Sequence, residues 1–196
     1  MKRILIAGIL GGLVAFVWSA IAHMNPFTGM LGLSVMDEKG ETNVLAALKS
    51  NVQQPGLYFF PGSEMLSSRT KEQEAAWMAK CQAGPVGLLL YDPKGREPMD
   101  PKQLVIEFVS TVLCALIAAY LLAASVGSLA CRATRVALMG LFAWLALSVS
   151  QWNWYHYPFS FIALDAIDQV IGWLLAGFLM AKLIKPPTPS SLPAQS

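Results

Sequence analysis

Five ionisable side chains stand within or beside long apolar segments of this sequence. They are His23, Glu107, His156, Asp165 and Asp168. Carboxylates and imidazoles act as general acids and bases, carry protons, and bind zinc, manganese or iron. Because a charged group is costly inside a hydrocarbon layer, each of these residues is a candidate functional position.

The spacing of the five residues predicts that they lie at one depth. Along a helix that rises 1.5 Å per residue, each is about 21 to 32 Å from the opposite end of its apolar segment. Helical periodicity also places Asp165, Asp168 and Gln169 on one face, and Glu107 and Ser110 on another. Polar faces belong inside a helical bundle, so we expect the five side chains to meet there.

This polar cluster allows three interpretations. The first is structural: Asp165 caps a helix, Glu107 pairs with Lys102, and the two histidines sit in headgroup water. The second is a transition-metal site, with His23, His156, Asp165 and Asp168 as its candidate ligands, although no HxxxH or ExxH pair is present.

The third interpretation is a proton-linked or ion-linked pathway. It would have to end inside the membrane, because the other halves of the segments carry no acidic residue or histidine. No catalytic residue is predicted, since no nucleophile with a neighbouring base forms a recognisable motif. GxxxxGK[ST], GxGxxG and GxSxG are all absent from the sequence, and no basic stripe predicts nucleic-acid binding.

The segments that carry these residues are long enough to cross a membrane. Hydrophobic residues make up 55% of the chain and charged residues only 13%, which is too apolar for an ordinary soluble protein. We predict an α-helical integral membrane protein, a bundle of four transmembrane helices. The predicted helices span residues 4–23, 104–126, 136–157 and 159–184.

The first segment also allows a second interpretation, a cleaved signal peptide. Lys2 and Arg3 precede the apolar run, and Ala20-Ile21-Ala22 resembles a cleavage site. A retained helix is favoured by its stripe of small residues on one face, as used in membrane helix packing. The stripe consists of Gly8, Gly12, Ala15, Ser19 and Ala22.

The distribution of basic residues predicts the orientation. Six basic residues lie beside the apolar segments, with no acidic residue among them. If successive helices alternate in direction, all six lie on one side of the membrane. They are Lys2, Arg3, Arg132, Arg135, Lys182 and Lys185. The positive-inside rule places this side in the cytoplasm. We therefore expect a bacterial inner (cytoplasmic) membrane protein with both termini inside, residues 186–196 as a flexible tail, and residues 24–103 outside.

The loop of residues 24–103 is too long to lack structure. Helical spacing over residues 42–52 and a capping box at Thr70 and Gln73 predict two helices. Short apolar runs at residues 56–62 and 85–93 predict two strands, so we expect a small α/β insertion. Its aromatic residues, Tyr58, Phe59, Phe60 and Trp77, are expected to form its core or to bind a partner.

Several stretches resemble a group of small bacterial four-span inner-membrane proteins to which no activity is assigned. They are MKRILIAGILGGLVAFVWS, PGLYFFPG, GPVGLLLYDP, QWNWYHYPFSF and DQVIGWLLAGFLMA. The resemblance supports the topology and the loop strands and implies no catalytic residue.

Taken together, the sequence favours a non-enzymatic accessory or assembly subunit that contacts a membrane-protein partner, or a second copy, through its outer insertion. The alternative is a metal-dependent or proton-linked protein that uses the polar cluster.

Overall fold

A computed structural model describes residues 1–25, 32–62 and 69–187. The chain divides into two compact units, which we describe separately. The helical unit contains residues 1–33 and 98–196, and the inserted unit contains residues 34–97. The predicted tail falls mostly on residues 188–196, which lie outside the described residues.

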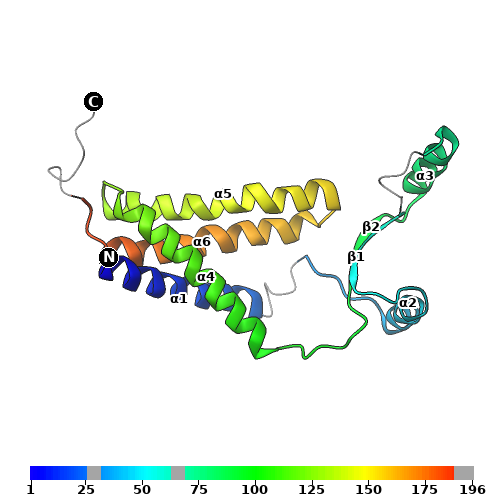
Figure 1. Ribbon diagram of the computed structural model, residues 1–196, viewed down its shortest axis with the longest axis horizontal. Coiled ribbons are helices and arrows are strands. Elements are labelled where there is room, and N and C mark those ends of the chain that lie inside the picture. The colour runs from blue at the N-terminus through cyan, green and yellow to red at the C-terminus, as the bar shows by residue number, and fades with distance from the viewer. Residues whose placement is uncertain (26–31, 63–68, 188–196) are drawn as a thin grey trace. The chain divides into compact units, whose positions relative to one another are not determined.

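The helical unit contains four helices that are long and apolar enough to cross a membrane, as predicted. They are α1 (Lys2–Met24), α4 (Pro101–Ala123), α5 (Leu129–Tyr155) and α6 (Phe159–Leu183). The start of α1 and the end of α6 lie at the same end of this unit (Figure 1). We call this the basic end and the other the polar end.

Local capping explains where two of these helices begin. The Asp100 side chain accepts a hydrogen bond from the backbone N–H of Lys102, and Pro101 occupies the first turn of α4. The Ser128 side chain caps α5 in the same way, so α5 begins at Leu129 rather than at the predicted residue 136. Hydropathy placed the start too late because the first turns of α5 carry two arginines.

Small residues allow α1 to pack closely against both α4 and α6. A Cβ atom added at Gly12 would lie 2.7 Å from the Cα of Val112, and one at Gly8 would lie 2.7 Å from the Leu116 side chain. The predicted small-residue face of α1 is therefore a helix contact. Helix α6 also packs along α5, whereas α4 and α5 touch only slightly.

Another face of α1 carries large apolar side chains at helical spacing. Leu5, Ile9, Leu13 and Val17 are 53%, 43%, 44% and 47% exposed. Leaving such side chains in water would cost about 1.5–3 kcal/mol each, whereas lipid accepts them. This surface, together with the length of the helices, is what a bilayer-embedded bundle requires.

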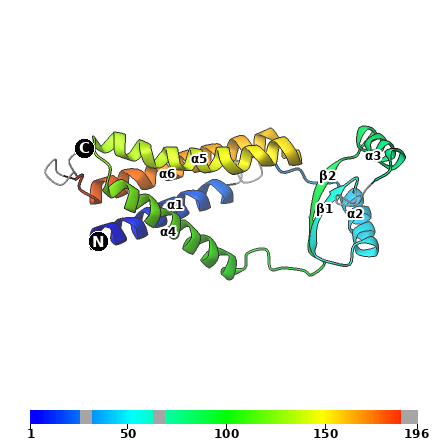
Figure 2. The same ribbon diagram turned by 45° about the horizontal axis from the view of Figure 1, so that its top comes forward.

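The described residues of the inserted unit form two helices and one two-stranded sheet (Figure 2). Its elements are α2 (Glu38–Asn51), β1 (Gly56–Phe60), α3 (Lys71–Ala83) and β2 (Gly87–Tyr91). The strands are antiparallel, with Leu57 opposite Leu90 and Phe59 opposite Leu88. The predicted capping box of Thr70 and Gln73 opens α3 with both of its hydrogen bonds.

The expectation of an aromatic core in the inserted unit is wrong for the described residues. None of those between residues 34 and 97 is buried, and Phe59 and Phe60 are 44% and 40% exposed. Trp77 is half-buried and donates a hydrogen bond to the Pro61 carbonyl. Two strands and two helices of this size do not enclose an interior, so the apolar side chains remain on the surface.

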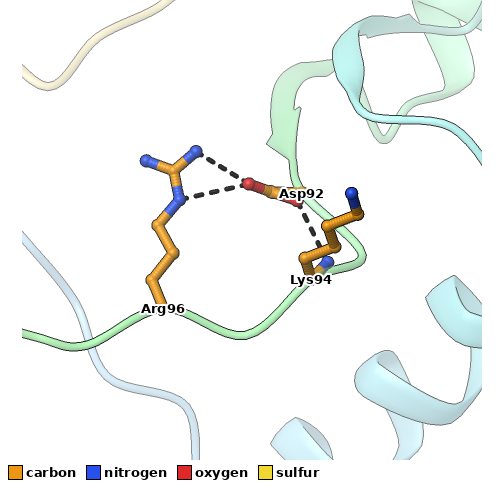
Figure 3. A network of polar contacts seen from close by, with 3 residues as sticks. All are labelled: Asp92, Lys94 and Arg96. Carbon is orange, nitrogen blue, oxygen red and sulfur yellow. Dashed lines mark hydrogen bonds and ion pairs between the residues drawn. The ribbon is translucent and has the colours of Figure 1, made fainter.

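A small polar network follows β2 (Figure 3). Nε and Nη2 of Arg96 donate to Oδ2 of Asp92 over 3.1 and 2.7 Å, and the Lys94 backbone N–H donates to Oδ1. The Arg96 guanidinium, and then the Lys94 N–H, hold the pKa of the Asp92 carboxyl below its ordinary value. These exposed contacts shape the turn and contribute little to stability.

We predict that Gly12→Ala weakens the helical unit. The added methyl group meets the Val112 backbone, which cannot rotate away, so overpacking costs about 1–3 kcal/mol. Denaturation of the purified protein in mixed micelles measures this change. Gly95→Ala is the matched control, because no atom lies within 4 Å of a Cβ at Gly95. Equal stability of the two variants would contradict the packing of α1 on α4.

Candidate functional site

The polar residues of α1, α4 and α6 surround two adjoining cavities near the polar end of the helical unit. Their volumes are about 170 and 430 Å³. Both are lined by Ser19, Glu107, Asp168 and Gln169, so we treat them together as the carboxylate cavity. The smaller part extends toward the bundle centre, and the larger part reaches His23 and Asp165.

Asp168 is the most buried carboxylate of this cavity, with only 6% of its surface exposed. Its Oδ2 accepts a long hydrogen bond of 3.4 Å from the Ser19 hydroxyl. Its Oδ1 is buried and makes no hydrogen bond of standard geometry with the described residues, although the Trp18 indole N–H, which is also unpaired there, interacts with this carboxylate. Leaving a buried acceptor unsatisfied is costly, so this oxygen calls for a donor.

Ser19 and His23 stand one turn apart on α1. Nδ1 of His23 lies 3.0 Å from the Ser19 carbonyl oxygen and 3.3 Å from the Ser19 hydroxyl. Because a carbonyl only accepts, Nδ1 carries the proton of this hydrogen bond. The histidine therefore turns toward its own helix rather than toward Asp168.

Asp165 lies between the carboxylate cavity and a further cavity of about 340 Å³ between α5 and α6. Its Oδ2 accepts a hydrogen bond from the Ser148 hydroxyl on α5. Gln169 lines both of these spaces, and its Oε1 accepts a hydrogen bond of 3.1 Å from the Trp173 indole. The polar residues thus extend across α6 from one side to the other.

The structure brings together four of the five predicted residues around the larger part of the cavity: His23, Glu107, Asp165 and Asp168. His156 is not among the residues that line it. It is exposed and ends α5 in the left-handed conformation, with φ of 59° and ψ of 30°. The chain turns away at this residue, which removes His156 from the expected cluster.

Three further expectations find no support among the described residues. No group of three or more His, Cys, Asp or Glu side chains there lies close enough to hold a metal ion. The one salt bridge found in that part of the chain joins Arg96 and Asp92, so the expected Lys102–Glu107 pair is not formed. Asp165 also does not cap α6, whose N-cap position is Pro158.

The contacts of Ser19 do not resemble those of a catalytic serine. In a Ser-His-Asp triad the histidine stands between the other two residues, so that it removes the serine proton while the carboxylate orients it. Here Ser19 stands between His23 and Asp168, and the protonated Nδ1 faces a carbonyl. The arrangement is suited to binding through hydrogen-bond acceptors.

Arg132 closes the basic end of the helical unit, a role that the sequence did not reveal. It is 2% exposed. Nη1 donates to the carbonyl oxygens of Ala181 and Ile184, over 3.1 and 2.7 Å, and Nη2 donates to that of Leu122 over 3.1 Å. These carbonyls lie at the C-terminal ends of α6 and α4, and that of Leu122 also accepts a hydrogen bond from the Ser125 backbone N–H.

Two tryptophans of the smaller cavity were also missed by the sequence analysis. Trp18 and Trp173 line it, and Trp18 Nε1 is buried without a hydrogen-bond partner among the described residues. Trp173 follows Gln169 by four residues, so helical spacing alone would have placed both on one face. Trp18 follows Ala15 by three residues and precedes Ala22 by four, so the same spacing would have placed it beside the small-residue stripe.

None of the family models, curated proteins or solved structures that were compared with this chain matches it.

We predict that Arg132→Met destabilises the helical unit by about 2 kcal/mol or more, because three buried hydrogen bonds to helix-end carbonyls are lost. Denaturation in mixed micelles and the amount of folded protein in membranes measure the effect. Arg135→Met removes the same charge from an exposed side chain that bonds to Ser125 and Val126, and should cost less. The opposite order would contradict the role given to Arg132.

Proposed function

We propose that this chain is a non-enzymatic accessory subunit of a bacterial inner-membrane protein assembly, which binds a partner protein through its inserted unit. One observation carries the proposal. Four large apolar side chains share one face of the two-stranded sheet, which we call the apolar hairpin face: Leu57, Phe59, Leu88 and Leu90.

Sheet geometry explains this face. Residues directly opposite each other in an antiparallel pair point to the same side, and every second residue does so along a strand. Leu57 is 62% exposed and Leu90 is 84% exposed, although both are apolar. An uncovered apolar face of this kind marks an interaction site.

The hairpin also supports a protein as the occupant. In the described part of the unit each strand has one neighbour, so its other edge is free to accept a strand from a partner. Charge does not favour an anionic lipid surface instead. Residues 34–97 contain eight acidic and seven basic residues and therefore lack the positive excess that attracts such lipids.

We predict that a photo-crosslinking residue at Leu57 captures one protein partner in membranes. Tyr58 is the matched control, because it is the next residue on β1 and points to the opposite, half-buried face. Leu90→Asp, opposite Leu57, should reduce the crosslink and the one-to-one copurification of the partner at least severalfold, because an apolar contact is lost.

The products distinguish the other occupants. Crosslinks to lipid alone would place the apolar hairpin face on the membrane and contradict a protein partner. A product of twice the chain mass would indicate a second copy and contradict the accessory role. Equal yields from Leu57 and Tyr58 would show that this face is not the contact surface.

We further propose that both termini lie in the cytoplasm and the inserted unit lies outside. Basic residues lie near the start of α1, the start of α5 and the end of α6. If successive long helices cross the membrane in alternating directions, these three ends lie on one side, which the positive-inside rule places in the cytoplasm. A fluorescent protein fused after Ser196 should fluoresce, and alkaline phosphatase inserted at Gly95 should be active. An inactive insertion with an active C-terminal phosphatase would reverse the topology.

A further inference from the structure

We propose that the carboxylate cavity binds the primary ammonium group of a small amine or of an aminophospholipid. The inference is independent of the partner-binding role proposed above, because it concerns the helical unit alone. It starts from Asp168, a carboxylate that is only 6% exposed. Its Oδ1 makes no hydrogen bond of standard geometry with the described residues.

The charge of the lining favours a cation. Three carboxylates line the larger part of the cavity, those of Glu107, Asp165 and Asp168, and the described residues around both parts include no Lys or Arg. Carboxylates that face a low-dielectric space are stabilised by a bound positive charge that also donates hydrogen bonds. Among the described lining residues, His23 is the one basic side chain, and it contacts the larger part alone.

The arrangement of the acceptors favours an ammonium group over a metal ion. No three metal-binding side chains converge among the described residues, whereas an ammonium group needs only separate acceptors for its N–H donors. Oδ1 of Asp168 can accept one of them, and the carboxylate of Glu107 and the side-chain oxygen of Ser19 line the same space. A quaternary ammonium group has no N–H donor and could not satisfy Oδ1.

The aromatic residues support the same ligand. Trp18 and Trp173 line the smaller part, and Phe16 lines the larger part. Cations are attracted to the faces of aromatic rings, and most strongly to tryptophan. A metal ion would gain little from these rings, whereas an alkylammonium group can place its charge on the carboxylates and its carbon atoms against the aromatic wall.

Two sources could supply the ammonium group. The cavity is partly open rather than enclosed and lies near the polar end of helices long enough to cross a bilayer. A dissolved amine could therefore enter it from water, and the headgroup of phosphatidylethanolamine could enter it from the lipid. Both present the same primary ammonium chemistry, and the experiment must separate them.

The test uses the full-length protein in nanodiscs of phosphatidylcholine, whose quaternary headgroup is the built-in control. Ethylamine is titrated at pH 7 and followed by tryptophan fluorescence and by the thermal unfolding midpoint. We expect a saturable fluorescence change and a higher midpoint with ethylamine, and neither with ethanol or tetramethylammonium at equal concentration. If the source is lipid, phosphatidylethanolamine in the nanodisc raises the midpoint by itself and reduces the response to ethylamine.

Variants locate the site. Asp168→Asn should weaken ethylamine binding about tenfold or more, because a charge-assisted hydrogen bond is lost. Glu107→Gln provides a second test in case Asp168→Asn does not fold. Glu97→Gln, which removes one negative charge from an exposed residue outside the cavity lining, should bind as the unmodified protein does.

Three results would overturn the proposal. The first is an unmodified protein that responds to neither ethylamine nor phosphatidylethanolamine. The second is an equal response to ethanol or tetramethylammonium. The third is unchanged binding by a folded Asp168→Asn or Glu107→Gln variant.

Discussion

The close approach of α1 to both α4 and α6 determines where the polar side chains of this protein meet. Gly8 and Gly12 allow this approach on the α4 side, and Gly172, whose added Cβ would lie 2.9 Å from Trp18, allows it on the α6 side. In lipid, helices gain little from burying apolar surface against each other, so close packing of this kind is a main source of association. Larger residues at these glycines would separate Ser19 from Asp168.

The two ends of the helical unit differ in the polar groups that they bring together. At the basic end, the Arg132 guanidinium donates to carbonyls at the ends of α4 and α6. At the polar end, carboxylates accumulate without a lysine or arginine among the described residues that line the cavity. Between them, small side chains such as Ala118, Ala119 and Ala176 fill the interior. The cavity therefore has no polar continuation toward the basic end.

The inserted unit follows a different logic from the helical unit. Lipid would cover the apolar side chains of the four long helices, which are long and apolar enough to cross a membrane, so these helices need only a small interior. The inserted unit has comparable apolar side chains on its sheet and no described residue that is buried. In water such a surface is unfavourable, which is why partner binding is the role we propose for it.

Hydropathy and helical spacing predicted the features that depend on local sequence. The four long helices, the two strands, the capping box at Thr70 and the small-residue face of α1 are of this kind. Helical spacing also brought Asp165, Asp168 and Glu107 to inward faces correctly.

The features that were missed depend on backbone conformation or on contacts between distant residues. His156 left the cluster because α5 ends there in a left-handed turn. Arg132 is a charged residue next to a short connection between two apolar segments, so the sequence suggested an exposed position. Its burial depends on the carbonyls of Leu122 and Ile184, which the sequence does not place beside it. The aromatic residues of the inserted unit were expected to form a core, because the sequence does not show that its helices leave the two-stranded sheet largely uncovered.

The most direct test of this account asks whether Ser19 and Asp168, 149 residues apart, stand side by side. Both are replaced by cysteine in a chain whose native Cys81, Cys114 and Cys131 are serine, with a protease site introduced at Gly95. A short bifunctional thiol reagent should link the two cleaved fragments in membranes. Ile167→Cys, an exposed neighbour of Asp168, should link to residue 19 far more slowly. Equal linking of residues 167 and 168 would contradict the cavity.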